Sequence, residues 1–338
     1  MTFLDNLEAK VLKQLKSQRI AFLLGAGSSY LDGKGYPLMS DLWSLIKGDI
    51  PDPERNDIQV KLNGGADGIE STLDLLDDGG VNETLHRYHV TRAIASYFSK
   101  LNPDLNIHSE FLKNFSRRAN RESVSIFSLN YDPLIERASE KAKVRVVDGF
   151  VGFESPFFDA NVFQEDVMVI RRGLVRRQYT PVHGVIRLYK LHGSVGWYTC
   201  PNNGLHRCSY NSIPLGTKHL MVPPQKRKST DTMNVPYVNL WSELRGVLRQ
   251  GQRPMIHRLF SVGYGMRDEH INAVLESALA RTDFTLLILA KRLEEIVFQR
   301  WGSKNNVIIV TNDRCSLNGV IGPGHHDLWS FERMSTEV

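Results

Sequence analysis

Residues 25–29, Gly-Ala-Gly-Ser-Ser, form a glycine-rich turn that begins at the last residue of the apolar run at 19–25. Without a Cβ atom, glycines let backbone N–H groups approach a pyrophosphate, and a following helix N-terminus adds partial positive charge. This pattern makes Gly25, Ala26, Gly27 and Ser28 candidate phosphate contacts. A tight turn between a strand and a helix remains the alternative.

Two other nucleotide chemistries fit this turn poorly. Tyr30 stands where a dehydrogenase fingerprint has its third glycine, and no acid closes a second strand about 20 residues later. Around Lys34, Ser28 and Gly35 occupy positions where a Walker A loop needs glycine and Ser or Thr. The sequence therefore disfavours both hydride transfer and nucleoside triphosphate hydrolysis.

Three reactive side chains follow two further apolar runs. Asn130 and Asp132 come after the run at 124–128, and His192 comes after the run at 186–191. The carboxyl ends of parallel strands meet at one rim, so these residues are expected to face the same crevice as the glycine turn. An imidazole there can accept a proton near pH 7. Asp132 before Pro133 also fits a helix N-cap, and a single histidine is often structural.

Two later strand ends carry weaker candidates. The segments 261–265 and 311–314 follow expected strands at 256–262 and 307–310. Small residues followed by Asn or Asp at such positions line ribose or adenine pockets, or form ordinary turns. The candidates at these two ends are Gly263, Tyr264 and Asn312.

These motifs need alternating strands and helices to position them. The pattern predicts an α/β fold with a doubly wound parallel sheet, formed by a single domain over 1–338. A helical insertion is expected at 51–105, and an irregular insertion, with one possible strand at 167–170, at 148–185. The other expected strands are 144–147, 219–222 and 284–290, and the expected helices are 37–47, 106–119, 132–141, 237–248, 268–280 and 293–301, with one more at the N-terminus.

Composition excludes several classes of protein. The 338 residues are 41% hydrophobic and 23% charged, and no apolar run approaches the roughly 18 residues of a membrane span. The amphipathic N-terminus does not resemble a signal peptide, so we expect a cytoplasmic protein without membrane contact. The net charge of +5 permits nucleic-acid contact, for instance at the basic segments 171–172, 176–177 and 226–228, but does not require it.

Three cysteines cannot supply the four thiolates of an all-cysteine zinc ribbon or a disulfide framework. Cys200, His206 and Cys208 offer three zinc ligands, but their spacing matches no standard module and no fourth ligand is evident. We therefore expect no zinc ribbon and no bound metal.

In order and spacing, these motifs resemble the sirtuin-like (silent information regulator) family. GAGSS with Gly35-Tyr36-Pro37 resembles its GAGxS…GxP cofactor loop, LNYDPLIE its Asn-Asp loop and KLHGS its catalytic histidine. SVGYGMRDEHIN and VIIVTND resemble its ribose and adenine contacts. Leu38-Met39-Ser40 replaces the Asp-Phe-Arg of the deacylases, which also have two zinc-binding Cys pairs. The closer resemblance is to the bacterial antiphage-defence branch.

This resemblance implies that NAD is the substrate and is hydrolysed to nicotinamide and ADP-ribose, or to a cyclised product, in an abortive-infection defence. His192 would be the base or ribose-activating group, and Asn130 would orient the water or the ribose hydroxyls. Asp132 would hold the nicotinamide amide. The remaining cofactor contacts would be Gly25, Ala26, Gly27, Ser28, Pro37, Gly263, Tyr264 and Asn312.

An unrestrained NAD hydrolase would kill its host, so its activity must be gated. The chain ends about 25 residues after Asn312, so no fused sensor domain is expected. Control is expected from homo-oligomerisation or from a separate subunit, for which the resemblance suggests a HerA-type DNA-translocating ATPase or an Argonaute-like protein. The alternatives are an NAD-dependent protein-lysine deacylase and a non-catalytic module that binds an ADP-ribose-type nucleotide or DNA.

Overall fold

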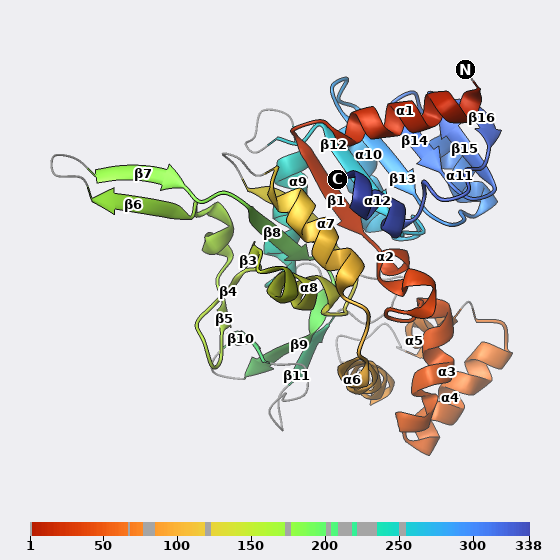
Figure 1. The fold of residues 1–338 in the computed structure, drawn as a ribbon. Helices are drawn as coiled ribbons and strands as arrows, with labels where there is room; N and C mark the ends of the chain where they lie inside the picture. Colours follow the sequence, from red (N-terminus) through yellow and green to blue (C-terminus); the bar gives the residue numbers. More distant parts are fainter. Residues whose placement is uncertain are drawn as a thin grey trace.

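A nine-stranded sheet forms the centre of the computed structural model (Figure 1). The structure describes residues 2–66, 68–76, 85–118, 123–172, 177–200, 204–208, 218–221, 235–249 and 255–338. Seven neighbouring strands are parallel, and two antiparallel strands close one edge. In sheet order they are β16 (Val320–Pro323), β15 (Arg314–Leu317), β14 (Val307–Val310), β13 (Thr285–Leu289), β12 (Arg258–Val262), β1 (Ile20–Leu24), β2 (Val124–Ser128), β8 (Val185–Lys190) and β3 (Arg145–Val147).

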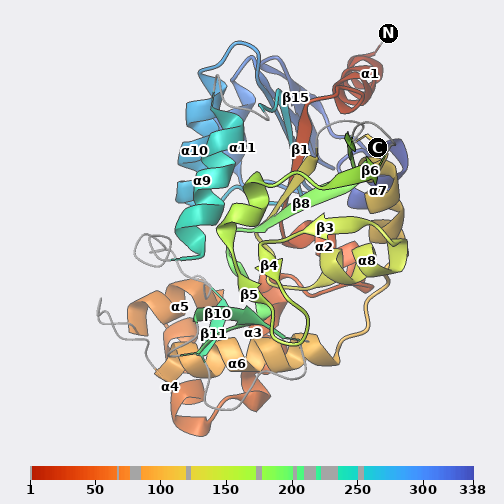
Figure 2. The same ribbon diagram turned by 90° about the vertical axis from the view of Figure 1, so that its left-hand side faces the viewer.

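Both faces of this sheet are buried, because the parallel strands are apolar at successive positions. Ala21 and Leu23 belong to the apolar core on one face, whereas Phe22 and Leu24 belong to the core on the other. Helices cover each face (Figure 2), which confirms the doubly wound α/β fold. The first face carries α9 (Tyr237–Leu248), α10 (Glu269–Leu279) and α11 (Glu295–Gly302); the second carries α1 (Phe3–Leu15), α7 (Asn106–Ser116), α8 (Leu134–Ala142) and α12 (Phe331–Glu337).

A helical unit lies beyond the carboxyl edge of the sheet (Figure 1). Its helices share a third apolar cluster that includes Ile46, Ile94 and Phe98 and reaches Tyr131 at the end of β2. This unit begins earlier than the expected insertion, because its first helix precedes residue 51. It contains α3 (Met39–Ile46), α4 (Asp52–Asn63), α5 (Gly68–Leu76) and α6 (Leu85–Lys100).

The segment expected to be irregular contains short strands. Two of them, β4 (Phe150–Val151) and β5 (Phe157–Phe158), join a second sheet of order β11-β9-β10-β5-β4. The chain passes from β8 through Leu191 and His192 directly into β9 of that sheet. The hairpin of β6 and β7 projects from the body of the molecule (Figure 1). The remaining bounds are β6 (Met168–Arg172), β7 (Arg177–Pro181), β9 (Gly193–Cys200), β10 (Gly204–Arg207) and β11 (Lys218–Met221).

The strand order reverses between β1 and β12. The chain leaves β1 toward β2 and β8 on one side, and it later returns to β12 on the other side of β1. In open α/β sheets, such a reversal opens a crevice at the carboxyl ends of the strands, where ligands bind. No helix among the described residues is long and apolar enough to cross a membrane.

Candidate functional site at the carboxyl edge of the sheet

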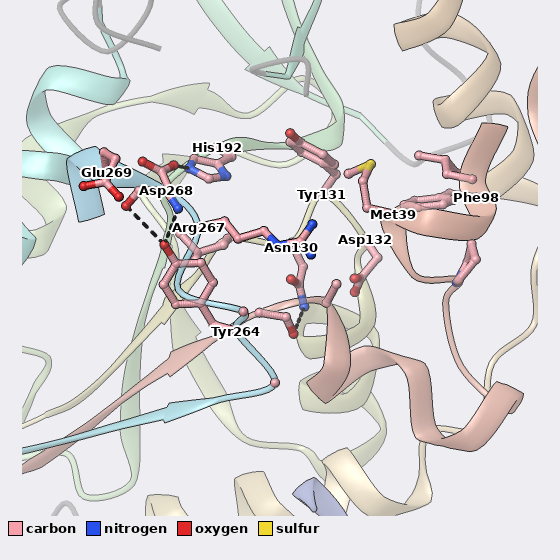
Figure 3. A pocket seen from close by; sticks show the side chains of 17 residues that line it. Met39, Phe98, Asn130, Tyr131, Asp132, His192, Tyr264, Arg267, Asp268 and Glu269 are labelled. Carbon is pink, nitrogen blue, oxygen red and sulfur yellow. Dashed lines mark hydrogen bonds and ion pairs between the residues drawn. The ribbon is translucent and has the colours of Figure 1, made fainter. Parts of the chain in front are cut away.

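Four strand ends meet beside the reversal point. Backbone hydrogen bonds continue one residue past each strand: Gly25 N–H donates to Val262 O at 3.0 Å, and Leu191 N–H donates to Ser128 O at 2.9 Å. The loops that follow enclose a cavity of about 390 Å³ (Figure 3). The predicted residues that line it are Gly25, Ala26, Pro37, Asn130, Asp132, His192, Gly263 and Tyr264.

The glycines hold two loops in close contact. A Cβ atom on Gly27 would lie 2.8 Å from the Cα of Gly263, and one on Gly25 would lie 2.6 Å from the Cα of Tyr264. Gly263 has a φ of +67°, and Gly27 N–H donates to its carbonyl at 2.8 Å. The short helix α2 (Ala26–Tyr30), which was not expected, begins at this contact, and the helix expected at 37–47 is α3. The tight approach of the two loops therefore accounts for these glycines, while Gly25 and Ala26 face the cavity.

Asn130 is fixed by its amide nitrogen. Nδ2 donates to the carbonyl of Gly25 at 3.0 Å and contacts the hydroxyl of Ser29 at 2.9 Å. The residue is 9% exposed, and Oδ1 has no hydrogen-bond partner among the described residues. This arrangement leaves a carbonyl-type acceptor at the wall of the cavity.

Asp132 lies in a buried charged cluster. Its carboxylate accepts from Leu134 N–H at 3.1 Å, and its side chain also faces the cavity. Asp132 is not the expected N-cap, because α8 begins at Leu134 and its N-cap is Pro133. The buried Lys190 ammonium donates to the Asp132 carbonyl and lies 3.3 Å from the carboxylate of Glu136. Burial raises the pKa of Asp132, and the Lys190 charge opposes that rise only in part. The residue therefore combines a structural role with access to the cavity.

His192 lines the same cavity as Asn130 and contacts an acid that the sequence analysis did not select. Its Nε2 lies 3.3 Å from Oδ2 of Asp268, and the two side chains are 5% and 7% exposed. Tyr264 O–H holds the backbone of Asp268 from both sides, because it accepts from the N–H at 2.8 Å and donates to the carbonyl at 3.2 Å. Asp268 stands within the motif GMRDEHIN, but local sequence gives no signal that it reaches His192.

The helical unit supplies an apolar wall of the cavity, which the sequence did not predict. Met39, Leu42 and Phe98 line the cavity. Met39 and Phe98 lie on the same side of it as Tyr131 and Asp132 (Figure 3). Met39, Leu42 and Phe98 belong to α3 and α6, whose spacing predicts helices but not what they face. Arg267 and Glu269 complete the rim, and an ion pair with Arg300 at 2.8 Å lowers the pKa of Glu269.

Three predicted contacts do not line this cavity. Gly27 packs against the Gly263 loop, and Ser28 is buried with its hydroxyl donating to the Gly25 carbonyl at 2.8 Å. Asn312 follows β14, which is three strands away from β1 in the sheet. A role for Asn312 at the adenine end of a longer ligand stays a prediction.

The candidate zinc ligands lie along one hairpin. Cys200 pairs with Gly204 at its end, His206 pairs with Tyr198, and Nδ1 of His206 contacts the Ser155 hydroxyl at 3.0 Å. Among the described residues, the group that could hold a metal ion is elsewhere, at residues 325–327. There Nδ1 of His325 already accepts from Leu328 N–H at 3.2 Å. Of the basic segments, 226–228 and residue 176 lie outside the described residues.

Comparison with known proteins finds distant structural relatives. A Sir2 mutant bound to a p53 peptide and NAD is 12% identical, with 98% of this chain and 97% of that chain covered and a TM-score of 0.44. A Sir2Tm structure bound to a propionylated peptide is 13% identical, with 97% of each chain covered and a TM-score of 0.44. No curated protein sequence matches the chain.

Comparison with protein families gives a match over the core of the chain. Residues 124–309, more than half of the 338, match the family described as SIR2-like domain. The matched range includes both Asn130 and His192. It also includes β2, β8 and β12, three of the four strands whose ends meet at the cavity. The chain therefore belongs to the SIR2-like family.

Proposed function

We propose that this protein hydrolyses NAD to nicotinamide and ADP-ribose. The observation that carries the proposal is the placement of Asn130 and His192 in one cavity, beside the backbone of Gly25 and Gly263 at the reversal point of the sheet. A ligand at such a point can place its pyrophosphate against the loop backbone and its reacting centre near the imidazole. Membership of the SIR2-like family supports NAD as that ligand.

The residues can carry the hydrolysis in one displacement. The bond between ribose C1′ and the nicotinamide nitrogen breaks, and both bonding electrons go to the nicotinamide, which becomes neutral. The oxocarbenium-like C1′ takes the oxygen of a water molecule, whose proton passes to His192. Oδ1 of Asn130 would orient that water or a ribose hydroxyl, and Asp132 would hold the nicotinamide amide. The products are nicotinamide, ADP-ribose and one proton.

Water rather than acyl-lysine is the proposed acceptor. Leu38-Met39-Ser40 stands where the deacylases carry Asp-Phe-Arg. The three cysteines of the chain also fall short of the two Cys pairs in the zinc module of deacylases.

We further propose that the hydrolase is the effector of an abortive-infection defence in the bacterial cytoplasm. Gating would come from homo-oligomerisation or from a partner subunit such as a HerA-type ATPase or an Argonaute-like protein. These proposals rest on the motif resemblance to the antiphage branch. Native mass spectrometry tests them, and a free monomer that hydrolyses NAD constitutively would contradict the gating.

Product analysis tests the reaction. The purified protein is incubated with NAD, with and without a candidate partner subunit, and in parallel with an acetylated peptide, and the products are separated by chromatography. We expect nicotinamide and ADP-ribose in equal amounts without peptide, and no turnover by His192→Ala. O-acetyl-ADP-ribose formed only with the peptide would instead show a deacylase. NAD binding without turnover in every arm would show a non-catalytic module.

A further inference from the structure

We propose that Asp268 is a positioning residue that fixes the protonation pattern of the His192 ring. The contact that suggests this role is the 3.3 Å approach of Asp268 Oδ2 to His192 Nε2, between two buried side chains. The approach is longer than a charge-assisted hydrogen bond and does not have hydrogen-bond alignment, as is common for catalytic pairs before substrate binds. The acid comes from the loop between β12 and α10, and the histidine follows β8.

The carboxylate of Asp268 is held before any ligand arrives. Oδ1 accepts from the backbone N–H groups of His270 at 3.0 Å and Ile271 at 3.4 Å, so it caps helix α10. Tyr264 clamps the backbone of the same residue through both its N–H and its carbonyl. One carboxylate oxygen therefore serves the helix, while the other faces the imidazole.

An ionised carboxylate only accepts hydrogen bonds, so the ring nitrogen that faces it must carry the hydrogen. His192 is then held with hydrogen on Nε2, and Nδ1 is the nitrogen that takes the proton from water. The negative charge of Asp268 also favours the imidazolium that forms as the proton arrives. This assignment of roles rests on the proposed hydrolysis, but the tautomer itself does not.

Helix capping alone would explain Asp268 without any effect on chemistry, and one substitution separates the two roles. Asn is as good an N-cap as Asp, so Asp268→Asn keeps the cap on α10 and removes the negative charge beside His192. Asp268→Ala removes both. Glu276→Gln is the matched control, because it neutralises an acid on the same helix whose carboxylate pairs with Arg300, outside the cavity lining.

Steady-state kinetics with NAD tests the role in the reaction. Asp268→Asn is expected to lower kcat about 100-fold, with little change in KM and an unchanged melting temperature. Asp268→Ala should show the same loss of kcat and a lower melting temperature. Glu276→Gln should keep the wild-type kcat. A kcat for Asp268→Asn within about twofold of the wild-type value, instead of the expected loss of about 100-fold, would overturn the proposal.

The ring tautomer provides a readout that needs no turnover. Long-range ¹H–¹⁵N spectra, with His192 assigned by its loss in His192→Ala, should show a pyrrole-type Nε2 and a pyridine-type Nδ1 in the wild-type protein. Asp268→Asn should lose this preference, and Glu276→Gln should keep it. The opposite tautomer in the wild type would refute the inference. If the protein does not hydrolyse NAD, the proposed function is refuted. The spectra still test whether Asp268 sets the tautomer of His192.

Discussion

The side-chain amide of Asn130 donates to the backbone carbonyl of Gly25 at 3.0 Å, across 105 residues of sequence. This hydrogen bond joins the end of β2 to the glycine turn after β1. The amide nitrogen of Asn130 therefore bonds the protein backbone, and its oxygen remains available to a ligand. The site is therefore organised by contacts between loops rather than within any one motif.

Replacing Asn130 should separate these two functions of the amide. Asn130→Ala removes the acceptor at the cavity, while the Gly25 carbonyl keeps its bond from Ser28 N–H at 2.9 Å. Asn130→Asp instead places a carboxylate against that carbonyl. We expect both variants to lose NAD turnover by about 100-fold or more. Urea denaturation should show that only Asn130→Asp is strongly destabilised, by about 1–3 kcal/mol. Wild-type turnover in Asn130→Ala would remove the residue from the mechanism.

Asp132→Asn should make the protein more stable and less active. The pKa of Asp132 is raised above its ordinary 3.8 by burial, so its ionised form destabilises the folded state at neutral pH. That penalty is absent below the pKa of Asp132 in the unfolded chain. It grows as the pH rises from there to the higher pKa of Asp132 in the folded protein. Asn can still accept from Leu134 N–H, and Lys190 keeps its contacts with the backbone carbonyl of residue 132 and with the Glu136 carboxylate.

We expect a gain on the order of 1 kcal/mol at pH 7 that shrinks as the pH approaches 4, measured by denaturation at both pH values. NAD turnover should fall at least about tenfold. A loss of stability at pH 7 would show that the carboxylate is stabilised by its neighbours instead.

Gly263→Ala should distort the cofactor loop. A Cβ atom there would lie 2.2 Å from Ser28 N and 2.5 Å from the carbonyl carbon of Gly27, at a φ of +67°. The expected cost is on the order of 3 kcal/mol, together with weaker NAD binding by calorimetry. Gly48→Ala is the control, because a Cβ atom at Gly48 has no neighbour within 4 Å. It should change stability by less than about 0.5 kcal/mol. Equal stability of the two variants would argue against the loop contact.

His108 predicts a specific loss of stability in acid. It is fully buried, stacks on Phe331 at 4.2 Å, and burial lowers its pKa from 6.5 to about 3. The folded state therefore excludes a proton that the unfolded state binds, so stability is complete above pH 6.5 and falls as the pH drops toward 3. The slope of the unfolding free energy against pH approaches about 1.4 kcal/mol per pH unit, because unfolding takes up one proton per molecule.

His108→Phe keeps an aromatic ring beside Phe331 and removes the titration. The difference in unfolding free energy between wild type and this variant, from urea curves at pH 7 and pH 5, should fall as the pH is lowered. A difference that does not change with pH would mean that His108 is not protonated on unfolding in this range.

The sequence allowed most of the scaffold to be predicted, because local patterns determine it. Four consecutive apolar residues bounded by polar ones gave β14 at Val307–Val310, and helical spacing gave α9 at Tyr237–Leu248. The predicted fold class and the resemblance to a sirtuin-like family are confirmed. The convergence of Gly25, Asn130 and His192 on one rim also follows from strand direction alone.

What could not be predicted depends on contacts between distant segments. The two-residue strands β4 and β5 exist because they pair with each other and β5 pairs with β10, and no local pattern marks them. The sequence around Asp268 predicts only a helix cap. Its contact with His192 depends on how its loop folds. Phe98 likewise reads as one apolar position on a helix, because its sequence spacing says nothing about the cavity that it lines.

The most direct test of the account is a crystal structure of the His192→Ala variant with NAD. We predict that the pyrophosphate lies against the backbone of Gly25 and Gly263, and that ribose C1′ lies beside Asn130 and the space left by the imidazole. NAD bound elsewhere on the protein, or no binding at millimolar NAD by a folded variant, would contradict the account.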